Sequence, residues 1–160
     1  MFSRFVSGAF GLLLLVACGS QAPTHAANSI ACSDVTAPHH AYVVVQHLSG
    51  ASIERCVGFT GSSIDGQTVM DQSGIEYETQ SVTSGKVVCQ VDLEPRQYSQ
   101  CFPQNHPYWA LFIESGGHWS SAPGGYAEIQ LHDTEALGWH YVNSGDPAPL
   151  PPPMPRQLAS

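Results

Sequence analysis

Apolar and polar residues alternate over short stretches along most of the chain, which is the pattern of β-strands rather than of long helices. Residues 41–48 (AYVVVQHL) are a run rich in β-branched side chains, bounded by Pro38 and by Ser49-Gly50. This composition predicts a strand that runs through the core. Residues 52–60 return after a turn at residues 49–51 and predict the second strand of a hairpin.

A helix of one or two turns is predicted before Gly74. Ser63 or Asp65 can cap its first turn, because a short oxygen-bearing side chain accepts from the unpaired backbone amides there. Val69 and Met70 supply its apolar edge, and Gly74 is suited to end it.

A second hairpin is predicted from residues 76–82 and 86–93, which alternate and are joined by the turn at residues 83–85. Alternation divides the second strand into two sets of side chains. We expect the core-facing set to be Val87, Cys89, Val91 and Leu93, and the other set to be Val88, Gln90 and Asp92.

All three tryptophans lie in residues 106–142, where short apolar runs are separated by Gly-rich turns. Residues 126–132 alternate and predict a half-buried strand with Ala127, Ile129 and Leu131 on one face. A further period-2 set predicts the last strand: Leu137, Trp139 and Tyr141. The fold class is therefore α+β and mostly β, one sheet with one short helix.

Three segments of this region resemble the signatures of the transcobalamin-like C-terminal domain family. They are residues 107–110 (PYWA), 117–125 (GHWSSAPGG) and 138–141 (GWHY), which look like the family's YWA, GxWxxS-x-x-G and GWxY signatures. The family occurs in vertebrate cobalamin carriers and in many bacterial surface proteins. The resemblance implies a β-grasp-like ligand-binding domain over residues 39–143.

The aromatic side chains of residues 106–142 include the candidate ligand contacts. Clustered Tyr and Trp side chains beside Gly-rich turns can form an apolar concavity, although such rings can equally be core. The resemblance implies a corrinoid or similar small molecule as ligand, yet this chain lacks the helical domain that completes the carriers' site. The candidate stacking residues are Tyr108, Trp109, Trp119, Tyr126 and Trp139.

The start of the chain predicts export. Residues 1–17 combine a basic residue with a short apolar core, as in a secretory signal peptide. Leu15-Val16-Ala17-Cys18 looks like a lipobox, in which Cys18 would become the diacylated N-terminus; an ordinary signal with an incidental cysteine is the alternative. We expect residues 18–38 to be a flexible tether, and the protein to be anchored by lipid on the extracytoplasmic face of the cell membrane.

The end of the chain, residues 144–160, is rich in proline and predicts a disordered tail with extended polyproline II character. It is either an inert terminus or a recognition ligand. The net charge of −8 argues against nucleic acid or anionic lipid headgroups as partners.

Four cysteines besides Cys18 predict a disulfide framework in an exported domain, with three connectivities open. A Cys89–Cys101 bridge would staple neighbouring segments and leave Cys32 for Cys56. Metal ligation and free thiols are the alternatives, but no Cys-x-x-Cys pair is present.

No catalytic motif is present: there is no Gly-x-Ser-x-Gly elbow, His-Glu-x-x-His, phosphate loop or dinucleotide fingerprint. The eight histidines show no spacing typical of a metal site, so we expect neither catalysis nor a resident cofactor. Two functions remain. One is a ligand-binding module that delivers a small molecule to a membrane transporter, and the other is a non-catalytic interaction or accessory subunit that binds another surface protein.

Overall fold

The computed structural model describes residues 30–83, 85–102 and 104–156. The predicted signal peptide, Cys18 and the first part of the tether lie outside these ranges. No helix in the described ranges is long and apolar enough to cross a membrane.

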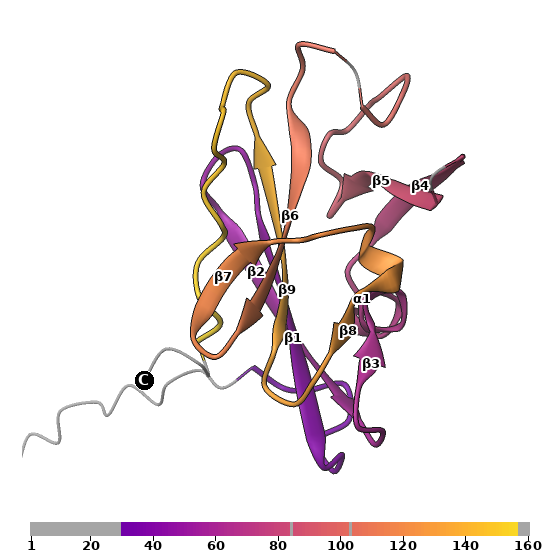
Figure 1. Ribbon diagram of the computed structural model, residues 1–160, viewed down its shortest axis with the longest axis vertical. Coiled ribbons are helices and arrows are strands. Elements are labelled where there is room, and N and C mark those ends of the chain that lie inside the picture. The colour runs from indigo at the N-terminus through magenta and orange to yellow at the C-terminus, as the bar shows by residue number, and fades with distance from the viewer. Residues whose placement is uncertain (1–29, 84, 103, 157–160) are drawn as a thin grey trace, which may run out of the picture.

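A mixed five-stranded sheet forms the centre of the molecule, in the order β2-β1-β9-β6-β7 (Figure 1). Its two end pairs, β1–β2 and β6–β7, are antiparallel hairpins, and the last strand, β9, inserts between them parallel to β1. This is the β-grasp arrangement, which confirms the predicted fold class. The strands are β1 (His39–Gln46), β2 (Ser52–Phe59), β6 (Tyr108–Ser115), β7 (His118–Ser121) and β9 (Ala136–Val142).

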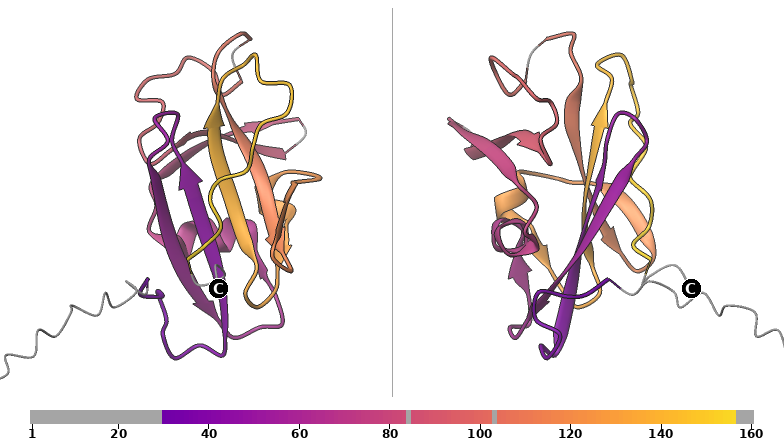
Figure 2. Two further views of the ribbon diagram at one scale, coloured as in Figure 1. Left: turned by 90° about the vertical axis from the view of Figure 1, so that its left-hand side faces the viewer. Right: turned by 180° about the vertical axis from the view of Figure 1, so that it is seen from behind.

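The predicted helix is α1 (Gly66–Ser73), and it packs across one face of the sheet, here called the inner face (Figure 2). Asp65 caps it by accepting from the Thr68 backbone amide at 2.9 Å, and Gly74 ends it in the left-handed conformation with φ +71°. Val69 and Met70 are fully buried against the sheet. The short strands β3 (Ile64–Asp65) and β8 (Gln130–Leu131) pair beside it.

The strand predicted for residues 126–132 is wrong in its first half. Tyr126–Glu128 is a 3₁₀ turn, η1, and only Gln130–Leu131 is extended and paired. The turn follows from close packing on α1: a Cβ atom at Gly66 would lie 2.2 Å from the Tyr126 carbonyl oxygen. Ile129 and Leu131 still point inward as the alternation predicted.

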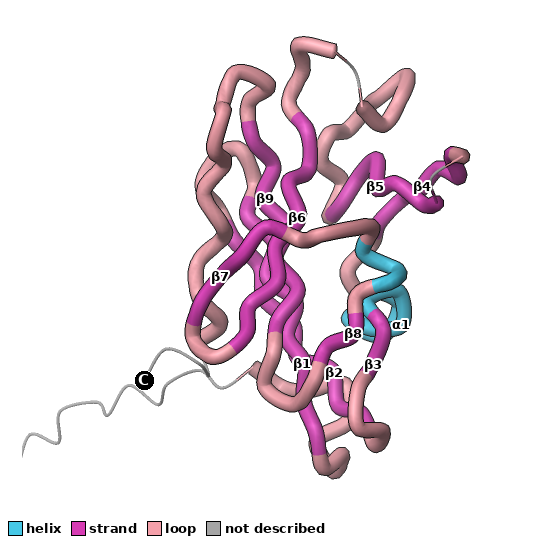
Figure 3. Tube along the Cα trace, in the orientation of Figure 1, coloured by secondary structure: helices cyan, strands magenta, loops and turns pink. Residues whose placement is uncertain are grey.

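The second predicted hairpin is β4 (Tyr77–Val82) and β5 (Gly85–Val91), which stands off the main sheet on the side of α1 (Figure 3). The predicted facing of its side chains is wrong in part. Glu78 pairs with Gln90 and Thr79 with Val88, so Cys89 is an extra residue in a β-bulge. The bulge reverses the alternation before Cys89, so Val88 enters the core. Leu93 is 59% exposed because it lies beyond β5, in a turn where Asp92 and Leu93 both have positive φ.

Two disulfides, Cys32–Cys56 and Cys89–Cys101, confirm the framework and select one of the three pairings. The first bridge joins the end of the predicted tether to the outer side of β2, where the Ser33 amide donates to the Cys56 carbonyl. The expected tether is therefore wrong for residues 30–38, which belong to the folded domain.

The prediction of a disordered tail is also wrong for the described residues 144–156. Pro152 and Pro155 are buried, because this segment packs across the face of the sheet opposite α1. We call this the outer face.

The helix cap provides a test of the fold. Asp65→Ala should lower the free energy of unfolding by about 1 kcal/mol, because it removes the only side-chain acceptor seen at this helix start in the described chain. Asp65→Asn retains an acceptor and serves as the control. Urea unfolding at neutral pH measures both.

The cap also predicts a pH dependence. Hydrogen bonds from the Thr68 backbone amide and then its hydroxyl hold the pKa of Asp65 below its ordinary value of 3.8. A depressed folded-state pKa means that the contribution is complete above 3.8 and is lost as pH falls through the folded-state pKa. The difference between the wild-type chain and Asp65→Ala should therefore shrink below pH 3.8, and an unchanged difference would contradict this.

Candidate functional site

The connection between β5 and β6 folds back over one end of the sheet and is held by the Cys89–Cys101 disulfide. We call residues 92–107 the stapled loop. A hollow of about 250 Å³, here the loop hollow, lies between it and the sheet. Its floor is formed by Tyr108, Trp109 and Tyr141, and its walls by Cys89, Pro95, Gln97, Tyr98, Ser99, Gln100, Cys101, His106 and Pro107.

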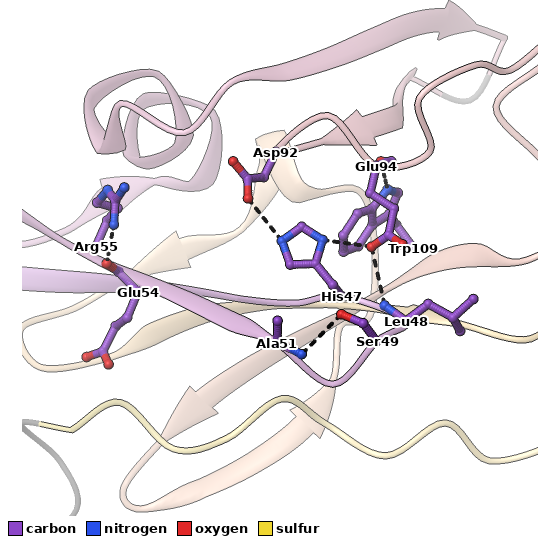
Figure 4. Close-up of polar contacts among 9 residues, drawn as sticks. All are labelled: His47, Leu48, Ser49, Ala51, Glu54, Arg55, Asp92, Glu94 and Trp109. Atoms are coloured by element: carbon purple, nitrogen blue, oxygen red, sulfur yellow. Dashed lines mark hydrogen bonds and ion pairs between the residues drawn. The ribbon is translucent and has the colours of Figure 1, made fainter.

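His47, just after β1, fastens the start of the stapled loop. Its Nε2 lies 3.0 Å from Asp92 Oδ2, and its Nδ1 lies 2.7 Å from Glu94 Oε2 (Figure 4). Both contacts are hydrogen bonds only when both ring nitrogens carry protons, so this arrangement suits a charged imidazolium between two carboxylates. The Leu48 amide also donates to Glu94, and the Trp109 indole donates to the Glu94 carbonyl at 3.0 Å.

Trp109 is the centre of this region. Its ring lies against Tyr141 at 4.9 Å between centroids and meets the edge of His47 at 6.3 Å. The side chain is buried, so it offers the loop hollow an edge rather than a free face. Burial, and secondarily the charge of Glu94, raises the pKa of Tyr141, which keeps its hydroxyl protonated near neutral pH.

A second hollow of about 140 Å³ lies on the inner face and shares Trp109 with the first. Its apolar wall includes Leu111, Tyr126 and Trp139, and the Tyr126 and Trp139 rings are 5.9 Å apart. The Trp139 indole nitrogen is buried and has no acceptor among the described residues. One residue that lines the second hollow, Trp139, therefore carries an N–H donor with no hydrogen-bond partner among the described residues.

Four of the five predicted ligand contacts line one or both of two hollows that share Trp109. Tyr108 and Trp109 line the loop hollow, and Trp109, Tyr126 and Trp139 line the second hollow. Trp119 lines neither hollow: it packs on the outer face with Tyr42 and Phe112, and the Phe112 cluster also includes Tyr108. The other buried rings lie mostly in the core and expose only part of their surface to the hollows. Each of the two interpretations, core residue and ligand contact, therefore fits part of each ring. Their role in binding stays a prediction.

Sequence reasoning missed the His47 fastening and the polar wall of the loop hollow. Tyr98 and His106 gave no periodic signal, since they lie in an irregular connection. His47 is 45 and 47 residues from its two carboxylate partners, so only the β-grasp topology brings them together. The charged-residue cluster around Asp92 and Glu94, followed by Pro95, was the one local sign of a special turn.

The described residues hold no group of three or more His, Cys, Asp or Glu side chains arranged to bind a metal ion. The His47 cluster illustrates why. Its two carboxylates contact opposite ring nitrogens, so the three side chains do not converge on one point.

Comparison with known proteins gives little further information. No family model matches the chain. No curated protein matches it either. Among solved structures, the chain is similar to a "putative metal binding protein" from Ruminococcus gnavus ATCC 29149, with 14% identity and a TM-score of 0.48 over 66% of this chain and 97% of the other.

The His47 fastening can be tested by His47→Leu. This change removes the imidazole partner of Asp92 and leaves Glu94 only the Leu48 amide, so it should lower the free energy of unfolding by about 1–3 kcal/mol. It should also speed proteolysis within the stapled loop. His118→Leu, at an exposed position of β7, is the control and should stay within about 0.5 kcal/mol of wild type. Equal behaviour of the two variants would contradict a fastening role.

Proposed function

We propose that this protein is a lipid-anchored extracytoplasmic module that binds a small molecule in the loop hollow. The observation that carries the proposal is the hollow itself, in which a disulfide-held loop covers the edges of Tyr108, Trp109 and Tyr141. Apolar rings combined with a few polar groups are the usual composition of a small-molecule site.

The volume limits the ligand. Sites for whole drug-sized ligands are roughly 300–1,000 Å³, and the loop hollow is about 250 Å³. It fits a ring-sized molecule or one end of a larger one. A corrinoid, which the family resemblance implies, would be covered only in part, and a partner such as a membrane transporter would supply the remaining contacts.

The lining also limits the ligand's charge. Within the described chain, the residues that line the loop hollow include no Lys, Arg, Asp or Glu. Tyr98 is held by donating its hydroxyl to Glu78, so this part of the wall is oriented. A neutral, planar group with hydrogen-bonding substituents matches such a wall best.

The compartment is supported independently of the ligand. Two disulfides in a small domain suggest an extracytoplasmic location, because disulfides persist in oxidising compartments. The lipobox-like Leu15-Val16-Ala17-Cys18 supports anchoring. Two acyl chains hold a protein stably at a membrane where one does not.

The alternative function, a non-catalytic interaction or accessory subunit of a membrane complex, draws support from the opposite face of the sheet. There the Pro-rich tail lies in a groove that contains an aromatic ring.

Ligand binding is tested by titrating the chain from residue 19 onward with corrinoids and haem while following tryptophan emission. Binding at the loop hollow predicts saturable quenching that Tyr108→Ala weakens by about ten-fold, roughly 1.4 kcal/mol. Trp119→Phe, at a residue that lines neither hollow, is the control and should bind as wild type. Absence of quenching through the micromolar range would reject these ligands, and equal loss in both variants would reject the site.

The anchor is tested separately by Cys18→Ser in the full chain. The variant should leave the membrane fraction and lose incorporation of labelled palmitate, because the modified sulfur is removed. Ser20→Ala is the matched control. Retained labelling in Cys18→Ser would contradict a lipid at this position.

A further inference from the structure

The outer face of the sheet carries a groove that the tail of the chain occupies. We call it the outer groove; Tyr42, Val44, Glu54, Trp119, Gly138 and His140 mark its course. The tail, residues 150–156, crosses it from β9 over β1 to β2 (Figure 2). It is on the side of the sheet away from α1 and the second hollow.

Two polar anchors fix the direction of the tail. At the first, His140 Nδ1 and the Leu150 carbonyl oxygen are 2.7 Å apart. At the second, the Arg156 backbone amide and Nε contact the two carboxylate oxygens of Glu54 at 3.1 and 3.3 Å. The Glu54 side chain is only 8% exposed, so this carboxylate is largely enclosed once the tail is in place.

Between the anchors, proline rings pack against the sheet. A Cβ atom at Gly138 would lie 2.8 Å from Pro152 Cγ and 2.6 Å from Trp119 Cζ3. Only glycine at this position lets both rings approach the strand. Pro155 is fully buried further along.

This combination is the chemistry of polyproline recognition. A Pro-rich segment is already extended before it binds, so it loses little conformational entropy, and grooves lined by aromatic rings accept its prolines. Here the groove supplies Trp119 for the rings, a histidine for a backbone carbonyl and a carboxylate for a terminal cation.

The chain's own tail does not complete the site. The Trp119 indole nitrogen is buried and has no acceptor among the described residues. A hollow of about 500 Å³ also remains between Pro153–Met154 and the β1–β2 hairpin. A segment that offered a carbonyl to Trp119, or filled this space, would bind more tightly, because a buried unpaired donor costs about 1–3 kcal/mol.

We propose that the outer groove is a recognition site for a proline-rich extended segment followed by a basic residue, supplied by another exported polypeptide. The chain's own tail is the competitor that occupies the site until such a segment arrives. This inference is independent of the loop hollow, since no residue that lines the loop hollow also marks the outer groove.

Competition by the tail sets the minimum affinity that a foreign segment needs in order to occupy the groove. A tethered segment acts at an effective concentration in the millimolar range for short linkers, so a foreign segment must bind more tightly than the tail to displace it. Proline-rich sequences that bind more weakly than the tail would therefore be excluded from the groove.

The test uses a chain that ends at residue 146 and a labelled peptide of residues 147–156, followed by fluorescence anisotropy. The truncated chain should bind the peptide saturably, and the full chain should bind it at least about ten-fold more weakly because its own tail competes. Gly138→Ala and Glu54→Gln should each weaken binding, as should replacing both Pro152 and Pro155 in the peptide by alanine. His106→Ala, which changes the wall of the loop hollow and lies outside the outer clusters, should bind the peptide normally, which separates failure of this site from failure of the loop hollow.

A second version keeps the tail during folding. A protease site placed at residues 144–146 of the full chain is cut after purification, and the labelled peptide must then exchange with the cut tail. No binding to a folded truncated chain, or no exchange in the cut chain, would overturn the proposal. Self-association of the full chain that disappears on truncation would place a second copy's tail in the groove and would overturn it as well.

Discussion

The structure depends on one constraint: the two central strands, β1 and β9, are apolar on both faces. Val43 and Val45 point to the inner face and Val44 to the outer, and all three are buried. Strands of this kind are continuous apolar runs, and they are stable only when both sides of the sheet are covered. A β-grasp sheet has a helix on one side only, so this chain requires a second cover.

The inner cover is made of short pieces rather than one long helix. The helix α1 has eight residues, and the 3₁₀ turn and the β4–β5 hairpin share the remaining area. Covers made of several pieces leave gaps at their boundaries. The second hollow, which shares Trp109 with the loop hollow, lies at such a boundary, between the hairpin and the sheet. On the outer face the cover is the tail with Trp119, and the remaining space beside Pro153 has the same origin.

The sequence predicted correctly those elements that depend on interactions between residues close together in the chain. The β-branched run, the Asp65 cap, the Gly74 stop and the first hairpin followed from residues within one turn or one strand of each other. The bulge at Cys89 was not predictable, because inserting one residue leaves the composition of a strand unchanged while reversing its facing.

The prediction of a disordered tail was wrong for a different reason. A proline-rich segment cannot form a strand, and by composition it resembles a disordered terminus. Its order comes from Gly138 and Glu54, which lie far away in sequence, and no local pattern reports them. Of the candidate site, the rings were identified but their division between two faces was not, because that division follows from the strand pairing around β9.

The same strand explains why one small domain could serve two partners. Along β9, Trp139 points to the inner face while its neighbours Gly138 and His140 point to the outer one. Alternation thus places adjacent residues at two surfaces that a packed sheet keeps apart. A ligand among the inner rings need not disturb a polypeptide in the outer groove, because no side chain is shared between the two sites. On the two proposals made here, the domain would be an adapter that binds a small molecule at one site and a polypeptide at the other.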